Sequence, residues 1–162
     1  MRKFDQASAI IAIELQNLIA EFGHDLDTNN GLNATDFYTE DGEFAVGDFS
    51  HKGHAAIRKF YSDRSERIRA VAKDGIRVSS HTFNNLRVTV RDPDNATIEF
   101  INVNYGGEGK PPVLGPIAPA MVTNCRMVCR READKIWRIT RFSGTPAFVG
   151  VDPFINKMLL KS

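Results

Sequence analysis

His81 is the residue in this sequence whose type and surroundings most suggest chemistry. It lies in a segment of alternating pattern, which puts Ser79, Phe83, Asn85 and Arg87 on its own side of a strand. A face that mixes polar and aromatic side chains is typical of a wet pocket. A free imidazole has a pKa of about 6.5, so a histidine can act as a base at neutral pH. The alternative is a structural histidine whose ring is held by a neighbour.

Two carboxylates near the end of the first predicted helix are candidates to orient that imidazole. Asp25 and Asp27 are separated by about 200° around a helix axis, so only one of them can face the rest of the fold. Each also has an ordinary explanation, because a carboxylate at a helix end accepts hydrogen bonds from the amides of the following turn. Helical geometry alone leaves both open.

Seven further side chains are predicted to line a substrate pocket. Asn85 can donate to a carbonyl oxygen, and Arg141, which shares strand parity with Trp137, can hold an anion beside an aromatic wall. An exposed ion pair explains Arg141 equally well. The full set is Phe22, Tyr38, Phe83, Asn85, Tyr105, Trp137 and Arg141.

No cofactor and no metal are expected. His51 and His54 form an H-x-x-H pair, but it straddles Gly53 at a helix start, and no third ligand has suitable spacing. The glycine-rich segment 106–110 lacks the Ser or Thr and the helix of a phosphate-binding loop. The nucleophile elbow and the dinucleotide fingerprint are also missing from the sequence.

Composition predicts one globular domain over residues 1–162. Hydrophobic residues make up 42% and charged residues 25% of the chain, and the formal net charge is +1. A net charge this small creates no positive electrostatic field that would attract nucleic acid. No segment approaches the roughly 20 apolar residues that a membrane span needs. Nucleic acid and membranes are therefore not expected as partners.

Two cysteines indicate the compartment. Cys125 and Cys129 lie four positions apart on a predicted strand, about 13 Å, which is beyond disulfide reach. Free thiols suit a reducing compartment, so we expect a cytoplasmic protein. Asp5 and Glu14 interrupt the apolar amino-terminal stretch, which argues against a signal peptide.

Helical patterns come first along the chain and strand patterns follow. Apolar residues recur at helical spacing over residues 5–27 and from Gly53 to Gly75, with a short helix over 32–38 and a brief strand over 43–48. A proline-rich connection over 106–119 is expected at a pocket rim, and a short helix after Pro153. The predicted long strands are 76–91, 97–105, 120–131 and 136–149.

This order predicts an α+β domain. Short polar turns join most of the long strands, which favours antiparallel hairpins. A curved, antiparallel or mixed sheet wrapped around the amino-terminal helices forms a cone, and its concave interior suits a small organic molecule.

Five short motifs follow one another along nearly the whole chain. They are Leu26-Asp27, FYTEDG at 37–42, KGHAAI at 52–57, SHTFNN at 80–85 and KIWRI at 135–139. In order and spacing the chain resembles SnoaL-like proteins of the NTF2-like superfamily. The resemblance implies a cone made of a strongly bent sheet and three helices, usually dimeric through the outer face of the sheet.

Within that superfamily the chain is most similar to the branch of scytalone dehydratase and the dehydrochlorinases. Members of this branch pair an Asp at the end of helix one with a His on the first long strand, which implies Asp27 and His81 here. In that branch the His removes a proton from a substrate carbon and the Asp holds its tautomer. The resemblance thus implies a cofactor-independent lyase or isomerase acting on a small apolar organic substrate. The alternative is a non-catalytic binding, accessory or structural domain.

A homodimer is expected through the outer sheet face. We predict an apolar patch there large enough to need covering. Its predicted members are Leu86, Val88, Val90, Val122 and Val128.

Overall fold

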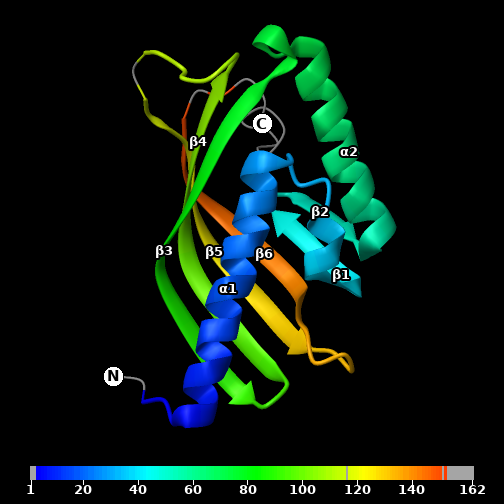
Figure 1. Ribbon diagram of the computed structural model, residues 1–162, viewed down its shortest axis with the longest axis vertical. Helices are drawn as coiled ribbons and strands as arrows, with labels where there is room; N and C mark the ends of the chain where they lie inside the picture. Colours follow the sequence, from blue (N-terminus) through cyan, green and yellow to red (C-terminus); the bar gives the residue numbers. More distant parts are fainter. Residues whose placement is uncertain (1–2, 116, 151, 153–162) are drawn as a thin grey trace.

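The computed structural model of the protein describes residues 3–115, 117–150 and 152 (Figure 1). Among these residues no helix is long and apolar enough to cross a membrane. The helix predicted after Pro153 lies outside the described residues. In chain order the elements are α1 (Gln6–Thr28), η1 (Ala34–Phe37), β1 (Tyr38–Val46), β2 (Phe49–Lys52), α2 (Gly53–Val71), η2 (Lys73–Gly75), β3 (Arg77–Asp92), β4 (Asn95–Glu108), β5 (Pro119–Arg131) and β6 (Trp137–Val149).

The strands form one six-stranded sheet in the order β2-β1-β6-β5-β4-β3. Neighbours are antiparallel except β1 and β6, which run parallel, so the sheet is mixed. In Figure 1 the long strands β3 and β4 bend, α1 crosses in front of the sheet, and α2 lies at the side of β1 and β2. The predicted α+β fold, a curved mixed sheet wrapped around amino-terminal helices, is confirmed, but the described residues form two α-helices where the resemblance implied three.

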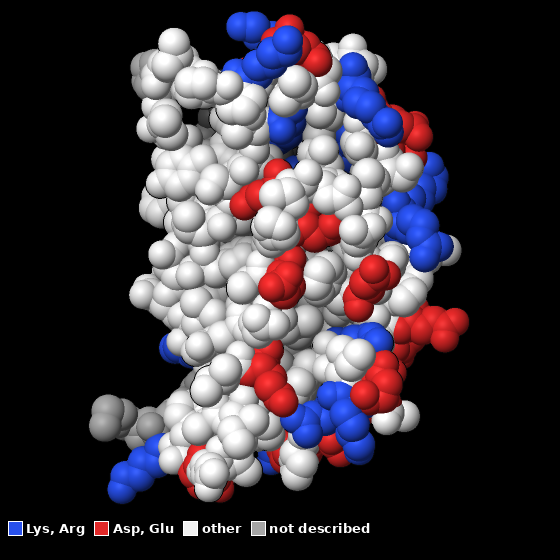
Figure 2. Space-filling model, in the orientation of Figure 1, with Lys and Arg blue, Asp and Glu red and all other residues white. Residues whose placement is uncertain are grey.

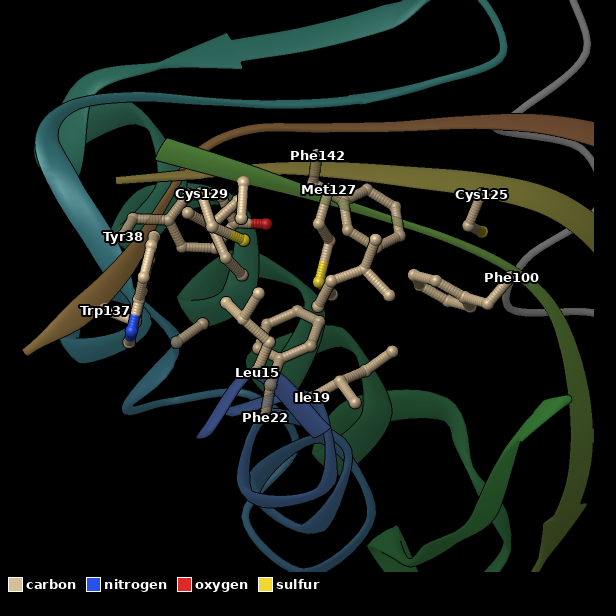
Figure 3. Close-up of a cluster of buried hydrophobic side chains, with 14 of the residues drawn as sticks. Leu15, Ile19, Phe22, Tyr38, Phe100, Cys125, Met127, Cys129, Trp137 and Phe142 are labelled. Carbon is tan, nitrogen blue, oxygen red and sulfur yellow. The ribbon is translucent and has the colours of Figure 1, made fainter. Parts of the chain in front are cut away.

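Helix α1 supplies the apolar layer that covers the concave face. Asp5 caps it by accepting a hydrogen bond from the Ser8 amide at 2.8 Å. Its residues Leu15 and Phe22 are buried on the stripe that the helical period predicts, and Figure 3 shows them facing Met127 and Phe142 of the sheet. This burial fixes α1 against the sheet and so fixes the position of its last turn.

The first hairpin differs from its prediction. The sequence suggests a turn over 39–42 and a strand over 43–48, but β1 already begins at Tyr38 and pairs with β2. The pairing of β1 with β6 is irregular between Tyr38 and Glu43, so the polar run is a bulged part of the strand. The predicted helix over 32–38 is a single 3-10 turn, Ala34–Phe37.

A β-bulge in β3 changes which side chains face inward. Between Asn84 and Arg87 the strand has one more residue than its partner β4, and Asn85 has φ 54°. One extra residue reverses the alternation for everything that follows it. The expectation that three hydrophobic residues of this strand lie on the outer face is therefore wrong. The residues that pack against the core instead are Leu86, Val88 and Val90.

A second bulge does the same in β6. Val128 and Cys129 are consecutive on β5, but their partners on β6, Arg141 and Ile139, are two positions apart, so β6 has one extra residue there. Trp137 before the bulge is buried, whereas Arg141 after it is exposed and donates from Nη1 to Glu43 Oε2 at 2.9 Å. Arg141 thus turns away from the aromatic wall on which it was predicted to lie.

Charged side chains of both signs share the surface. In Figure 2 acidic side chains gather across the middle of the viewed face and basic side chains lie mainly at the upper right, whereas the left side is almost uncharged. This distribution agrees with the formal net charge of +1.

Candidate active site

Asp27 and His81 are 54 positions apart in sequence and in direct contact in the fold. His81 Nδ1 lies 2.6 Å from Asp27 Oδ1, and the His81 backbone amide donates to Asp27 Oδ2 at 2.9 Å. Both carboxylate oxygens are therefore engaged by one residue, which fixes the carboxylate relative to the ring. The His81 side chain is 7% exposed and that of Asp27 24%.

Asn104 holds the other side of the imidazole. Strand register places it opposite His81 on β4, and its Nδ2 lies 2.7 Å from His81 Nε2. With the amide nitrogen donating, Nε2 is the acceptor and the ring proton resides on Nδ1, where Asp27 accepts it. These contacts favour the neutral tautomer whose basic lone pair is on Nε2.

His81 and Asn104 line a cavity between the helices and the concave face of the sheet. Its volume is about 100 Å³, below the usual range of small-molecule sites, so it suits a compact molecule. Aromatic rings from α1, β1, α2, β3 and β6 dominate the wall, and an apolar wall increases the weight of each polar contact made inside it. The polar residues beside His81 and Asn104 are Arg64, Asn102 and Thr123.

Of the predicted aromatic lining, Phe22 and Phe83 belong to this wall. Tyr38 lies in the core behind it, with its ring centroid 6.0 Å from that of Phe22, and burial raises the pKa of its phenol. Tyr105 lines a separate surface hollow together with the proline-rich connection, which therefore does not form the rim of the cavity. Trp137 is buried and donates its Nε1 hydrogen to Glu14 at 2.8 Å.

The predicted polar ligands fall outside the cavity. Asn85 occupies the bulge of β3 and is exposed, and Arg141 forms the surface pair described above. Both were assigned to the pocket by strict alternation, which the bulges interrupt. Asp25 is buried and its Oδ1 accepts from Asn29 Nδ2 at 2.9 Å, so it serves the helix end while Asp27 contacts the imidazole.

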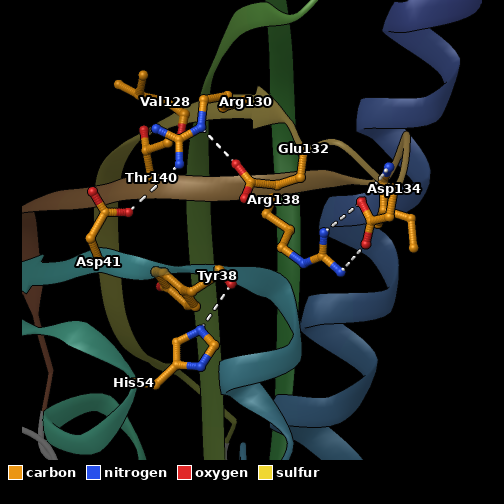
Figure 4. Close-up of polar contacts among 10 residues, drawn as sticks. Tyr38, Asp41, His54, Val128, Arg130, Glu132, Asp134, Arg138 and Thr140 are labelled. Carbon is orange, nitrogen blue, oxygen red and sulfur yellow. Dashed lines mark hydrogen bonds and ion pairs between the residues drawn. The ribbon is translucent and has the colours of Figure 1, made fainter.

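The two histidines of the H-x-x-H pair make unrelated contacts. His54 Nε2 lies 3.0 Å from the carbonyl oxygen of Tyr38 (Figure 4), and the His51 ring lies 4.7 Å from that of Phe60. Across the described residues no three His, Cys, Asp or Glu side chains gather in a way that could hold a metal ion.

Sequence reasoning missed several cavity residues, and those that bear on its polarity are Asn102, Asn104, Thr123 and Arg64. A signal for the two asparagines exists, because Phe100, Asn102 and Asn104 share one strand parity while hydrophobic residues occupy the other. Two amides on the inward side of a central strand are costly unless they have partners, so such a pattern indicates a polar site.

Comparison with known proteins agrees with this architecture. The SnoaL-like domain family matches residues 12–143. None of the curated proteins matches the chain.

Three solved structures illustrate the fold. An NTF2-like protein with a cystatin-like fold from Novosphingobium aromaticivorans is 24% identical over 100% of this chain and 99% of its own, with a TM-score of 0.67. A Catenulispora acidiphila protein in complex with S-DNPA is 18% identical over 85% of this chain and 94% of its own, with a TM-score of 0.69. A candidate scytalone dehydratase from Novosphingobium aromaticivorans is 14% identical over 90% and 92%, with a TM-score of 0.69. Because the family match spans most of the residues that build the cavity, the chain belongs to the family of SnoaL-like domain proteins.

Proposed function

We propose that this protein is a cofactor-independent lyase or isomerase in which His81 removes a proton from a carbon atom of a small organic substrate. The observation that carries the proposal is the hydrogen-bonded pair of Asp27 and His81 at the wall of an apolar cavity. A base oriented by a carboxylate and facing a dry cavity is the arrangement that general-base catalysis uses.

In the proposed step a substrate C–H bond breaks and a bond between hydrogen and His81 Nε2 forms. The electron pair left on carbon moves into an enolate in an isomerase, or expels a leaving group from the neighbouring carbon in a lyase. Asp27 already accepts the hydrogen of Nδ1, so its negative charge stabilises the imidazolium without taking the proton.

Asn104 has a second part in this proposal. Its amide occupies the hydrogen-bonding position of Nε2, so the substrate C–H must take that place. An amide released from the ring can donate to the substrate oxygen on which negative charge develops. A donor of this kind typically contributes several kcal/mol, on the order of 3, to the transition state.

The Asn104 contact also supports a second function, that of a ligand-binding or accessory domain without chemistry. A ring with both nitrogens satisfied is what a structural histidine shows. In that case His81 stabilises the cavity wall, and a bound molecule leaves unchanged. The Catenulispora acidiphila protein of similar fold is in complex with S-DNPA, and binding of a small molecule agrees with either function.

The two functions are separated by a neutral probe of proton abstraction from carbon, 5-nitrobenzisoxazole. A base removes its ring C–H, the N–O bond breaks, and a coloured cyanophenolate forms. We expect the native protein to accelerate this ring opening above the buffer rate, and His81→Ala to reduce it at least about 100-fold toward that rate.

The matched control is His24→Ala, which removes an exposed histidine one turn before Asp27. This variant is expected to open the probe at the native rate. Equal rates for the native protein and His81→Ala, or binding of the probe without any acceleration, contradict the catalytic proposal and favour the binding domain.

We also propose a cytoplasmic homodimer that buries the outer face of β4 and β5. The two buried, unpaired thiols support a reducing compartment. Val103 and Val122 are direct cross-strand partners on this face and are half-buried, which supplies apolar surface at its centre.

A further inference from the structure

Arg64 is the cationic member of the cavity wall. It extends from α2, lines the cavity together with His81, and also lines a surface groove over α2 and β2. Within the described part of the chain, its guanidinium has no hydrogen-bond or ion-pair partner. Arg64 is half-buried between the cavity and the surface groove, and its guanidinium offers five N–H donors to an anion there.

The carboxylates near Arg64 are engaged elsewhere. Asp152 acts on it through its charge, but both Asp152 oxygens accept from Arg77, at 3.2 and 2.5 Å, in a buried pair. Asp63, the preceding residue of α2, pairs with Lys59 at 2.8 Å. Burial is the main cause that lowers the pKa of Arg64, and an incoming anion would relieve that penalty.

The floor of the cavity offers further polar atoms that lack partners. Asn102 on β4 and Thr123 on β5 are direct cross-strand partners, and both line the cavity. Asn102 Oδ1 and Thr123 Oγ1 are buried without a hydrogen-bond partner in the described structure. Asn102 lies two positions from Asn104 on the same face, about 7 Å along the strand. Polar groups thus extend from the imidazole across the sheet by roughly the width of one aromatic ring.

We propose that the substrate of this cavity is a compact aromatic compound with an anionic oxygen, a carboxylate or a phenolate, which Arg64 binds. Its aromatic body packs against the phenylalanine rings, and a second polar substituent reaches Asn102 and Thr123. This assignment rests on the proposed function only for the role of His81, because the binding of an anion by Arg64 is independent of turnover. The sequence predicts an apolar substrate, and the substrate proposed here has an apolar body with one charged group.

The experiment compares two probes of nearly equal size and shape, 4-nitrobenzoate and its neutral amide, 4-nitrobenzamide. Binding is measured by isothermal titration calorimetry at a fixed ionic strength. The native protein is expected to bind the carboxylate at least about tenfold more tightly than the amide, the effect of one charge-assisted hydrogen-bonded pair. Arg64→Gln is expected to remove this preference.

Arg67→Gln is the matched control. Arg67 lies on the same helix and lines the surface groove, but is not part of the cavity wall, and its loss changes the net charge equally. This variant is expected to keep the preference for the carboxylate. Arg64→Lys keeps the positive charge but lacks the planar guanidinium, so it is expected to retain part of the preference for the carboxylate. This variant shows whether the result for Arg64→Gln comes from the lost charge or from a folding defect.

A second probe pair distinguishes the two sources of the anionic oxygen. The affinity ratio of 4-nitrophenolate to nitrobenzene is compared with that of 4-nitrobenzoate to 4-nitrobenzamide. A larger ratio for the first pair indicates that the substrate carries a phenolate, and a larger ratio for the second pair indicates a carboxylate. The proposal is overturned if the native protein binds each neutral probe as tightly as its anion, or if Arg64→Gln and Arg67→Gln keep the same preference. Because 5-nitrobenzisoxazole is neutral, failure of this proposal remains distinguishable from failure of His81 as a base.

Discussion

At the scale of single residues, the imidazole of His81 is held from both sides. Asp27 accepts at Nδ1 and Asn104 donates at Nε2, so the ring has a defined tautomer and orientation. For His81 to act as a base, the substrate must be able to replace Asn104 at Nε2. Asp27 must stay hydrogen-bonded to Nδ1 throughout the reaction. Variants of these two partners therefore affect a reaction in different ways.

Asp27→Asn is expected to slow 5-nitrobenzisoxazole ring opening by about 10² or more, because an amide can donate to Nδ1 and favour the wrong tautomer. Nitrogen-15 NMR of the imidazole should show the ring proton moving from Nδ1 toward Nε2. The control is Asp36→Asn, an exposed acidic residue of η1. An unchanged tautomer together with an unchanged rate would contradict this account of Asp27.

The two thiols provide a prediction about pH. Burial raises the pKa of Cys125 and of Cys129 from the usual 9.0 to about 12. At pH 8 we expect neither thiol of the folded protein to react with 5,5′-dithiobis(2-nitrobenzoate) on a time scale on which the urea-unfolded chain reacts completely. Rapid reaction of the folded protein would show that the thiols are accessible.

The same shifts set the sign of a stability change. The pKa of each thiol is higher in the folded than in the unfolded state, so folding stability is fully present below the unfolded value of 9.0. It decreases as the pH rises from there toward about 12. Urea midpoints measured at increasing alkaline pH should therefore fall, and they should fall less in a Cys125→Ala, Cys129→Ala double variant.

At the scale of secondary structure, the two bulges decide which side chains reach the cavity. The period of two correctly relates His81 to Phe83, because both precede the bulge of β3. It fails for Asn85, which occupies that bulge, and for Arg141, which follows the bulge of β6. A bulge adds one residue without altering composition, so a single sequence gives little warning of it.

Periodic patterns predicted the main elements but not every residue of the site. The helix over residues 5–27 and the long strands have strong periodic patterns, and the structure has them with ends shifted by a few residues. Arg64 has no such signal, because its place in the cavity depends on how α2 lies against β1 and β2. The resemblance selected Asp27 over Asp25, a choice that helical geometry left open.

The bulge of β3 makes a prediction about stability. Asn85 has φ 54°, a left-handed conformation that asparagine and glycine tolerate and β-branched residues do not. Asn85→Val is expected to lower the free energy of unfolding by about 1–2 kcal/mol in urea titrations, and Asn85→Gly to change it by less than about 0.5 kcal/mol. Equal losses for the two substitutions would show that backbone conformation is not what the residue provides.

At the scale of the whole molecule, the proposed homodimer uses the outer face of the sheet. Of the predicted patch, Val122 and Val128 are half-buried, whereas the residues of β3 pack against the core. The cavity opens on the opposite, concave side, so a dimer of this kind leaves the site of each subunit accessible.

Val122→Glu tests this arrangement, because it places a charge beside Val103 at the centre of the proposed interface. Sedimentation velocity is expected to give a dimer for the native protein and a monomer for the variant. Leu114→Glu is the control, since Leu114 is 90% exposed on the connection between β4 and β5. A native protein that sediments as a monomer would contradict the dimer and leave the cavity proposal intact.

The most direct test of the central claim is a double-mutant cycle on 5-nitrobenzisoxazole ring opening with His81→Ala and Asp27→Asn. If Asp27 acts only through the imidazole, the double variant is expected to be as slow as His81→Ala alone, because the two losses are not additive. If Asp27→Asn slows the reaction by the same factor in the presence and absence of His81, the two residues act separately, and the account of an oriented base is wrong.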